Sequence, residues 1–596
     1  MHIEINTLHA KDGTPIIELI SDDKSYRMNS IYKPHDEAVK FASKFSDIDD
    51  NTVLLVFGFG NGIFPDSIMK MCEERKIKLI FYEPSEDLME YIGHNYDISS
   101  LSVMDNVYFL SHIETDEKIG FYNISEFALL LESLITYANY RNVVSIALPR
   151  YIEIFPSEYK EFDKQIQYRI HRLKSNVMTA KDMGYEAVVN NIQNLRYISD
   201  SYCADSFVGV FPADMPAIIV SAGPSLEKNV RVLKGFKNKA LILCVDTAAA
   251  YLIKENIIPD MIICVDAVKP LSMFEDDRLL GIPIAVGTDV NYKVLDRMKT
   301  SPIIFATTEN PYIQSLYRIG GHTIDKLKSG GSVANLAFSL CIYWGFQNII
   351  LVGQDLALSN DQMYVGNIEN TVVPDSVLRK KIDVEDIYGN TIYTYNDYYS
   401  YLMWFEQEIA ANPQINVIDA TEGGAMIHGT TITTLQAICD KYGNNNCDVD
   451  VLSLYKNAPL AFDAYQKKGI GDRIRASKET LANLRERLEY GIDISKQAIR
   501  LLQMDDIDTD QIVRLEKEMK EICMYYDSLE EGFLIQRMID ATDLEAFMMI
   551  FDQKAAASRQ EQYSRMKLYF ECLLRALKPV ESEWANIQSM EQYDPL

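Results

Sequence analysis

A short apolar run that leads into small and turn-forming residues holds the first candidate chemistry of this chain. Residues 217–221 are apolar up to a final serine, and Gly223-Pro224-Ser225 follow. Such a run predicts a buried strand, and glycine, proline and serine suit a tight turn that starts a helix. Because a helix N-terminus presents free N–H groups and a positive dipole end, it attracts anions. The pattern predicts a phosphate or nucleotide site, with a ligand-free turn as the alternative.

Polar residues follow several other apolar runs in the same half of the chain. The chemistry-bearing residues at these ends are Asp246, Thr247, Asp266, Gln354, Asp355, Glu422, Gly423 and Gly424, and Gly330, Gly331 and Ser332 precede a further helical stretch. In a parallel sheet the carboxyl ends of the strands meet at one edge, where ligands bind. The residues therefore predict one shared site, although each aspartate alone could simply cap a helix.

The segment between Asp355 and Asn396 is rich in tyrosine and shows no clear helical pattern. Tyrosine hydroxyls donate hydrogen bonds to phosphates, and a long loop over a binding face is often a lid. An ordinary surface loop is the alternative. Together with Lys326, Lys328 and Ser332, these tyrosines could hold a leaving phosphate. No P-loop motif occurs and no Asp-x-Asp follows a central strand, so no metal site is predicted.

These residues need a scaffold, and the pattern of residues 212–442 supplies one. Apolar runs predict strands at 217–221, 241–245, 261–266, 283–288, 303–307, 348–353 and 415–419. Helical patterns lie between them, near 226–235, 247–255, 333–345, 396–411 and 431–441. This alternation is typical of an α/β fold with a doubly wound, mostly parallel sheet.

The regions before and after residues 212–442 have different predicted structures. Residues 53–62 form a predicted strand followed by Gly58-Phe59-Gly60-Asn61-Gly62, and a second strand ends in Glu83. This layout favours a Rossmann-like unit, whose glycines either admit a ligand or serve packing alone. The predicted division is a Rossmann-like domain (1–155), a helical bridge (156–211), a central domain (212–442) and a helical C-terminal domain (443–596).

Composition and charge exclude several classes of function. The 596 residues carry a net charge of −28 without a long basic run, which disfavours nucleic acid and anionic membranes as partners. No apolar stretch is long enough for a membrane span. The nine cysteines are scattered singly and form no Cys-x-x-Cys pair. With no secretory signal at the N-terminus, this pattern predicts a cytoplasmic protein.

The ordered motifs resemble a known family. The motifs at residues 221–226, 245–248, 259–260, 265–266, 330–334, 353–357 and 421–425 come in the order seen in the motility accessory factor (Maf) family of flagellin glycosyltransferases. The central domain of that family is similar to bacterial sialyltransferases. The resemblance implies an inverting, metal-independent enzyme that moves pseudaminic or legionaminic acid from its CMP-activated form to flagellin serine or threonine hydroxyls in the cytoplasm. The CMP-nonulosonic acid is the donor substrate, and no cofactor is implied.

The same resemblance assigns roles to positions. Gly223, Pro224 and Ser225 would contact the nucleotide, and Asp246 and Thr247 would lie beside the ribose or the sugar. Gly331 and Ser332 would hold the phosphate or the sugar carboxylate. Glu422, Gly423 and Gly424 would face the cytosine.

The chain departs from this pattern at the general base. The related sialyltransferases use a histidine, whereas Tyr364 stands where that histidine would be expected, and only His322 and His428 lie nearby in sequence. A carboxylate can remove a hydroxyl proton instead. The candidates are Asp246, Asp266 and Asp355.

Two rival functions stay open. A pterin pyrophosphokinase-like enzyme would place Mg²⁺ on Asp246 and Asp266 and ATP phosphates on the glycine turns. A flagellin-binding assembly factor without catalysis would use the helical C-terminal region instead. A requirement for magnesium distinguishes the pyrophosphokinase from the transferase. Loss of function in Asp246→Ala with retained flagellin binding distinguishes the transferase from the assembly factor.

Overall fold

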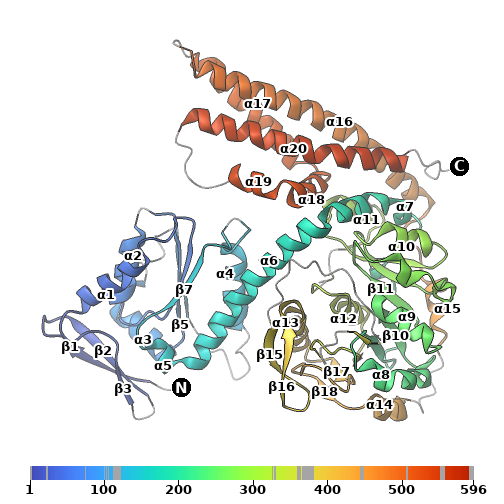
Figure 1. Cartoon of the computed structure of the whole chain (residues 1–596), viewed down its shortest axis with the longest axis horizontal. Helices are drawn as coiled ribbons and strands as arrows, with labels where there is room; N and C mark the ends of the chain where they lie inside the picture. The colour runs from blue at the N-terminus through green and yellow to red at the C-terminus, as the bar shows by residue number, and fades with distance from the viewer. Residues whose placement is uncertain are drawn as a thin grey trace. The chain divides into compact units, whose positions relative to one another are not determined.

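The computed structural model describes residues 3–21, 24–73, 75–98, 101, 104, 106–111, 122–137, 139–324, 327, 330–358, 364–365, 381–442, 449–504, 508–550 and 558–588. The chain forms two compact units, and the boundary between them falls between Met178 and Thr179, inside helix α6 (Pro156–Gln193). Central and C-terminal residues belong to the same second unit. Figure 1 shows the elements of both units.

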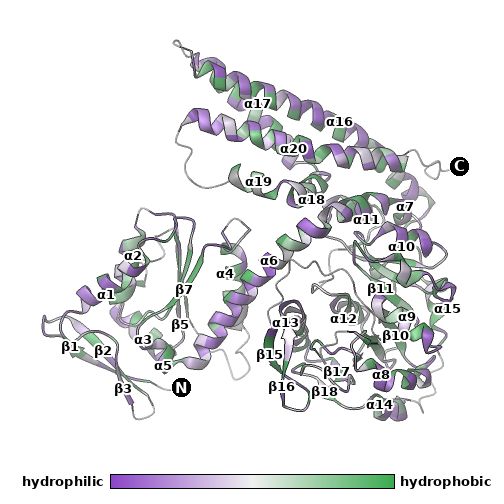
Figure 2. Ribbon diagram, in the orientation of Figure 1, coloured by the Kyte–Doolittle hydropathy of each residue, from purple (hydrophilic) through white to green (hydrophobic). Residues whose placement is uncertain are grey.

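The first unit contains an α/β sheet of Rossmann type. Its described strands pair in parallel in the order β6-β5-β4-β7. They are β4 (Val53–Phe57), β5 (Lys78–Glu83), β6 (Val107–Ser111) and β7 (Val143–Ala147), and the helices are α1 (Pro34–Ala42), α2 (Ile63–Cys72), α3 (Glu86–Asn95), α4 (Tyr122–Leu134) and α5 (Tyr151–Ile154). A separate antiparallel sheet comprises β1 (Glu4–His9), β2 (Pro15–Ser21) and β3 (Lys24–Arg27). Figure 2 shows the central strands mainly in the colour of hydrophobic residues, as expected for strands covered on both faces.

The second unit is built on a long parallel sheet. Among the described residues the strand order is β18-β17-β14-β9-β10-β11-β12-β13-β8, and every neighbouring pair is parallel. The strands are β8 (Tyr202–Cys203), β9 (Ala217–Val220), β10 (Leu241–Val245), β11 (Met261–Cys264), β12 (Ile284–Gly287), β13 (Ile303–Thr307), β14 (Asn348–Val352), β17 (Asn416–Asp419) and β18 (Thr431–Ile432). The predicted doubly wound parallel sheet is confirmed.

The order of the strands defines where a ligand should bind. From β9 the chain builds outward through β10, β11, β12 and β13, and it then returns to place β14 on the other side of β9. The direction of winding therefore reverses between β9 and β14. In open α/β sheets the crevice outside the carboxyl ends of two such strands is the usual ligand site.

Most predicted helices of this unit are present. They are α9 (Asp246–Lys254), α12 (Val333–Trp344), α13 (Asn396–Ala411) and α14 (Leu435–Tyr442). The helix predicted over 226–235 is instead a short α8 (Leu226–Asn229) that continues as a 3-10 helix (Val230–Phe236). Two helices were not predicted, α10 (Tyr292–Arg297) and α11 (Pro311–Ile319), although Asn291 and Asn310 cap them as asparagine commonly does.

The tyrosine-rich segment is partly regular, contrary to the predicted loop. Strands β15 (Lys381–Glu385) and β16 (Thr391–Tyr395) form an antiparallel hairpin. The turn is held by Asp386, whose carboxylate accepts from the backbone N–H groups of Tyr388 and Asn390, each at 2.8 Å. The rest of the predicted lid, 359–363 and 366–380, lies outside the described residues.

The C-terminal part is helical, as predicted. Its helices are α15 (Val451–Asn457), α16 (Ala464–Leu501), α17 (Thr509–Asp527), α18 (Gly532–Thr542), α19 (Leu544–Ile550) and α20 (Arg559–Gln588). The long α16 begins at a reciprocal capping box between Asp463 and Gln466. Figure 2 shows hydrophobic and hydrophilic residues alternating along α16 and α20, which pack against each other. None of the described helices combines the length and apolar character that a bilayer crossing requires.

Candidate functional site

The turn after β9 lies against the turn after β14. The N–H of Ser221 donates to the Val352 carbonyl and the N–H of Gly223 donates to the Gly353 carbonyl, both at 2.8 Å. A Cβ atom on Gly223 would lie 1.9 Å from an oxygen of Asp355, so only glycine fits there. The two predicted turns are therefore neighbours at the point where the winding reverses.

Asp355 is the centre of this arrangement. Its carboxylate accepts from the Ser225 hydroxyl at 2.7 Å and from the Ser225 N–H at 3.3 Å. Its own carbonyl accepts from the N–H of Ala425 at 2.7 Å, in the turn after β17. Gly424 in that turn has a φ of 79°, and a Cβ there would lie 2.3 Å from the Asp355 carbonyl oxygen. Three turns from three adjacent strands thus meet at one aspartate.

The environment of Asp355 changes its acidity. Burial raises the pKa of this carboxyl to about 6, although the hydrogen bonds from Ser225 and the charge of Lys228 oppose the shift. Only 3% of the residue is exposed. A carboxyl with a pKa close to neutral is suited to proton transfer.

The turn after β17 carries a cation on its surface. The ammonium of the exposed Lys228 donates to the Glu422 carbonyl at 2.7 Å. The amide of Asn229 donates to the Glu422 carboxylate at 3.2 Å and to the Ala420 carbonyl at 2.8 Å. Glu422 has a left-handed φ of 62°, a strained conformation that its neighbours must hold. Glu422, Gly423 and Gly424 are partly exposed beside the Gly223 turn.

A second cluster follows β10 and β11 on the same edge. Lys269 is almost completely buried, and its ammonium lies 3.1 Å from an oxygen of Asp246 and 3.7 Å from an oxygen of Asp266. It also donates to the Thr247 hydroxyl at 3.4 Å. Burial lowers the pKa of this lysine, but Asp246, Cys264 and Asp266 together outweigh burial and the net direction is upward. Lys269 is therefore charged and paired.

The two aspartates of this cluster differ in access. Asp246 is 1% exposed, and its second oxygen is buried without a hydrogen-bond partner. Asp266 keeps 32% of its side chain exposed, and one oxygen accepts from the N–H of Val268 at 3.1 Å. Asp266 is the carboxylate that a substrate could reach.

The glycines before α12 have a packing role. Gly330 has a φ of 60°, and a Cβ there would lie 2.6 Å from the Trp404 ring. Gly331 has a φ of 88°, and a Cβ there would lie 3.1 Å from the Tyr401 ring. Ser332 caps α12 by accepting from the Asn335 N–H at 3.1 Å. Rings from α13 therefore cover this helix start, and Lys326 and Lys328 lie outside the described residues.

Tyr364 and Gln354 belong to the region of the Gly223 turn. Val365, the residue after Tyr364, donates its N–H to the Ala222 carbonyl at 2.9 Å. Gln354 is buried, accepts from the Ser221 hydroxyl and donates its N–H to Thr421. His428, by contrast, is exposed and pairs with Glu406 of α13.

The turn of the first unit is closed by an aromatic ring. A Cβ on Gly58 would lie 2.6 Å from the Tyr151 ring, and a Cβ on Gly62 would lie 2.4 Å from the Tyr96 ring. Glu83 accepts from the Tyr151 hydroxyl at 2.6 Å and from the Phe59 N–H at 2.9 Å. Burial raises the pKa of Glu83 to about 7. These contacts favour the packing interpretation of this motif over a ligand site.

Sequence reasoning missed three polar residues of the second unit. Lys228 and Asn229 follow Ser225 within the first helical turn, a spacing that could have indicated them. Lys269 follows Asp266 by three residues, but only the fold shows that it also reaches Asp246.

Comparisons with known proteins agree with this fold. A family model described as 6-hydroxymethylpterin diphosphokinase MptE-like matches residues 189–361. No curated protein matches the sequence. A solved structure entitled "Structure of MAf glycosyltransferase from Magnetospirillum magneticum AMB-1" is similar with a TM-score of 0.50 and 13% identity, over 99% of this chain and 94% of the other. At this identity the likeness shows the fold, and the resemblance to the motility accessory factor architecture is confirmed at that level.

Proposed function

We propose that this protein is a glycosyltransferase that moves a nonulosonic acid of pseudaminic or legionaminic type from a CMP-activated donor to serine or threonine hydroxyls of flagellin in the cytoplasm. One observation carries the proposal: three strand-end turns converge on Asp355 where the sheet reverses its winding. The whole-chain similarity to a structure entitled as a Maf glycosyltransferase supports it. The choice of a CMP-activated donor and of flagellin as the acceptor rests on the family resemblance of the ordered motifs in the central region.

The donor would lie across the Gly223 and Glu422 turns. Their partly exposed backbone offers a close approach, and Lys228 supplies positive charge for a phosphate without a metal ion. Tyr364, beside the same turn, would donate a hydrogen bond to the phosphate as CMP departs. No cofactor beyond the donor is proposed.

Asp266 would act as the general base, because it is the accessible carboxylate of the edge. It would take the proton of the acceptor hydroxyl as that oxygen attacks the anomeric carbon from the side opposite CMP. The bond to the CMP phosphate oxygen breaks, its electron pair stays on the phosphate, and the configuration inverts. Lys269, 3.7 Å from an oxygen of Asp266, would help to hold this carboxylate in place.

The test separates binding from chemistry. We expect Asp266→Asn to abolish release of CMP from CMP-pseudaminic or CMP-legionaminic acid in the presence of flagellin, while calorimetry shows unchanged CMP affinity. We expect Asp355→Asn to weaken both the release of CMP and the affinity for CMP, because Asp355 holds the turns together. Full transfer by Asp266→Asn would refute its assignment as the base.

The match to the diphosphokinase-like family model favours a second candidate, a Mg²⁺-dependent pyrophosphoryl transfer from ATP. That reaction would place the metal between Asp246 and Asp266. The Lys269 ammonium occupies this position, 3.1 Å and 3.7 Å from their oxygens. ATP binding that requires Mg²⁺ and is lost in Asp246→Asn would favour this candidate over the transferase.

A further inference from the structure

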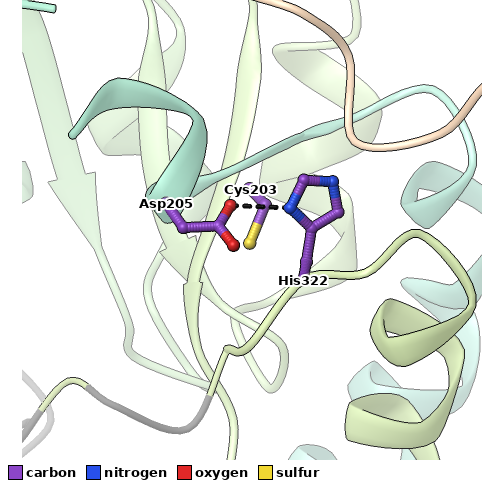
Figure 3. A group of neighbouring side chains, drawn as sticks. All are labelled: Cys203, Asp205 and His322. Carbon is purple, nitrogen blue, oxygen red and sulfur yellow. Dashed lines mark hydrogen bonds and ion pairs between the residues drawn. The ribbon is translucent and has the colours of Figure 1, made fainter. Parts of the chain in front are cut away.

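A cluster of three potential metal ligands lies in the second unit, outside the site described above. Figure 3 shows Cys203, Asp205 and His322 with their polar atoms facing one another. One ligand atom from each lies within 4.8 Å of the other two. Cys203 ends the edge strand β8, Asp205 belongs to the 3-10 helix Ala204–Phe207, and His322 follows α11. Residues distant in sequence thus meet at the edge of the sheet.

The cluster belongs to a different edge of the fold from the strand-end turns. Trp344, the last residue of α12, donates its indole N–H to the Ala204 carbonyl at 2.8 Å. Strands β10, β11, β12 and β13 lie between β9 and β8 in the sheet order, so β8 lies at the far end of the sheet from the turns after β9 and β14. The cluster is therefore separate from the Asp355 turns.

Neighbouring groups orient the ligands as they do in metal sites. The Nε2 atom of His322 lies 2.7 Å from the Ala461 carbonyl, which fixes the proton on that nitrogen and leaves Nδ1 facing Asp205. The second oxygen of Asp205 accepts from the Thr323 N–H at 3.4 Å. The Phe462 ring packs edge-on against the imidazole. Metal-binding histidines usually donate their other N–H to a carbonyl or carboxylate in this way.

The same geometry excludes a cysteine hydrolase arrangement. Such a site needs one imidazole nitrogen on the thiol and the other on the carboxylate. Here Nδ1 lies 2.8 Å from Asp205 and Nε2 faces a backbone carbonyl, so no nitrogen is left to activate Cys203. Burial and the Asp205 charge also raise the pKa of the thiol.

We propose that Cys203, Asp205 and His322 bind a Zn²⁺ ion. One sulfur, one nitrogen and one oxygen ligand suit zinc better than the hard cations Mg²⁺ and Ca²⁺. Asp205 and His322 keep 22% and 18% of their side chains exposed, so water can reach the fourth position. Binding would widen the Oδ1–Nδ1 separation from 2.8 Å to roughly 3.3 Å, which small side-chain rotations allow.

The ion would hold a short edge strand in place. Strand β8 is two residues long and pairs only with β13 among the described strands. Zinc would join it to the loop after α11, and through His322 to Ala461, which precedes α16. We expect a structural role, because the cluster is separate from the proposed transfer site.

Cobalt substitution tests the proposal on the full chain. After chelator treatment, one equivalent of Co²⁺ should produce a thiolate-to-cobalt charge-transfer band in the near ultraviolet, and equimolar Zn²⁺ should remove it. The band should disappear in Cys203→Ser and shift or weaken in His322→Gln. Cys439→Ser and His9→Gln, which change a cysteine and a histidine outside the cluster, should leave it unchanged.

A second readout covers the case in which Cys203→Ser fails to fold. Zn²⁺ alone should raise the melting temperature of the wild-type protein and of both control variants, but not that of Asp205→Asn or His322→Gln, whose altered side chains are partly exposed. Absence of the cobalt band in the folded wild-type protein would overturn the proposal. So would a band of unchanged position and intensity in His322→Gln, or equal stabilisation of all variants by Zn²⁺.

Discussion

The chain contains two strand–glycine–helix turns that look alike in sequence and differ in structure. In the first unit Gly58, Phe59, Gly60 and Gly62 are all buried, and the Tyr151 ring fills the space above Gly58. In the second unit Gly223 and Pro224 are partly exposed. Each turn has its own buried carboxylate: Glu83 accepts from the Phe59 N–H in the first, and Asp355 accepts from the Ser225 N–H in the second. What separates them is the access left for another molecule.

The difference shows that a glycine turn alone does not identify a ligand site. Glu83 is sealed by Tyr151, and all its bonds lie within the unit's own core. Asp355 instead connects the buried turn after β14 to the turns at Gly223 and Glu422, which stay partly exposed and have Lys228 at their surface. The second turn also lies where the sheet reverses its winding, and such a position favours ligand binding.

The largest expected effect comes from a side chain at Gly223. In Gly223→Val the Cβ would overlap an Asp355 oxygen, at 1.9 Å, and separate the turns. We expect CMP affinity to fall at least a thousandfold, or about 4 kcal/mol. Calorimetry measures the loss, and circular dichroism checks folding. The matched variant Gly58→Val should destabilise the first unit and leave CMP affinity unchanged. Equal loss of CMP binding in both would break the comparison.

The next effect concerns Glu83 and pH. Its pKa is about 7 in the folded protein and 4.5 in the reference state. The folded state therefore holds a proton that the unfolded state releases, and the stabilisation present below pH 4.5 is lost as pH rises through 7. We expect a loss of about 3 kcal/mol for wild type across this window. Glu83→Gln should lack it.

Hydrogen exchange in β4 and β5 measures this difference, after correction for the intrinsic exchange rate. Tryptophan fluorescence cannot replace it, because Trp344, Trp404 and Trp584 all lie in the second unit. The same pH dependence in Glu83→Gln and wild type would show that Glu83 is not the titrating group.

A smaller effect is expected at Lys228. Lys228→Met removes the ammonium beside the Glu422 carbonyl but leaves the buried Asp355 contacts in place. We expect CMP affinity to fall about tenfold, or about 1.4 kcal/mol, with little change in melting temperature. Lys254→Met, at the end of α9, is the matched control. If CMP affinity is unaffected by Lys228→Met, the donor phosphate does not lie at this turn.

The smallest effect is expected for Tyr151→Phe. The ring stays above Gly58, but the hydroxyl no longer donates to Glu83 at 2.6 Å or accepts from the Phe59 N–H at 3.3 Å. We expect about 1 kcal/mol of destabilisation, seen only in hydrogen exchange of the first unit. A change in CMP affinity would instead connect the first turn to the ligand and contradict its packing role.

The sequence predicted the parallel sheet well because apolar runs and turn residues are local signals. It also placed Gly223 and Asp355 at one edge, since parallel strands end together. It could not show that the Tyr151 ring fills the first turn, because residues 58 and 151 meet only in the fold. The pairing of Lys269 with Asp246 could not be predicted either, because these residues also meet only in the fold.

Two further misses have different causes. The alternation of polar and apolar residues over 381–385 and the Gly389-Asn390 turn could have indicated the β15–β16 hairpin. The many tyrosines of this segment favoured a loop instead. Cys203 and Asp205 lie more than a hundred residues before His322, so no metal-ligand spacing exists to be recognised.

The most direct test is calorimetric titration of the full chain with CMP and with ATP, each with and without Mg²⁺. We predict that CMP binds equally well with and without metal and that Gly223→Val abolishes this binding while Gly58→Val does not. Binding of ATP that requires Mg²⁺, with no binding of CMP, would contradict the transferase and favour the diphosphokinase-like reaction. No binding of either nucleotide would contradict the claim that the turn at Gly223 is a nucleotide site.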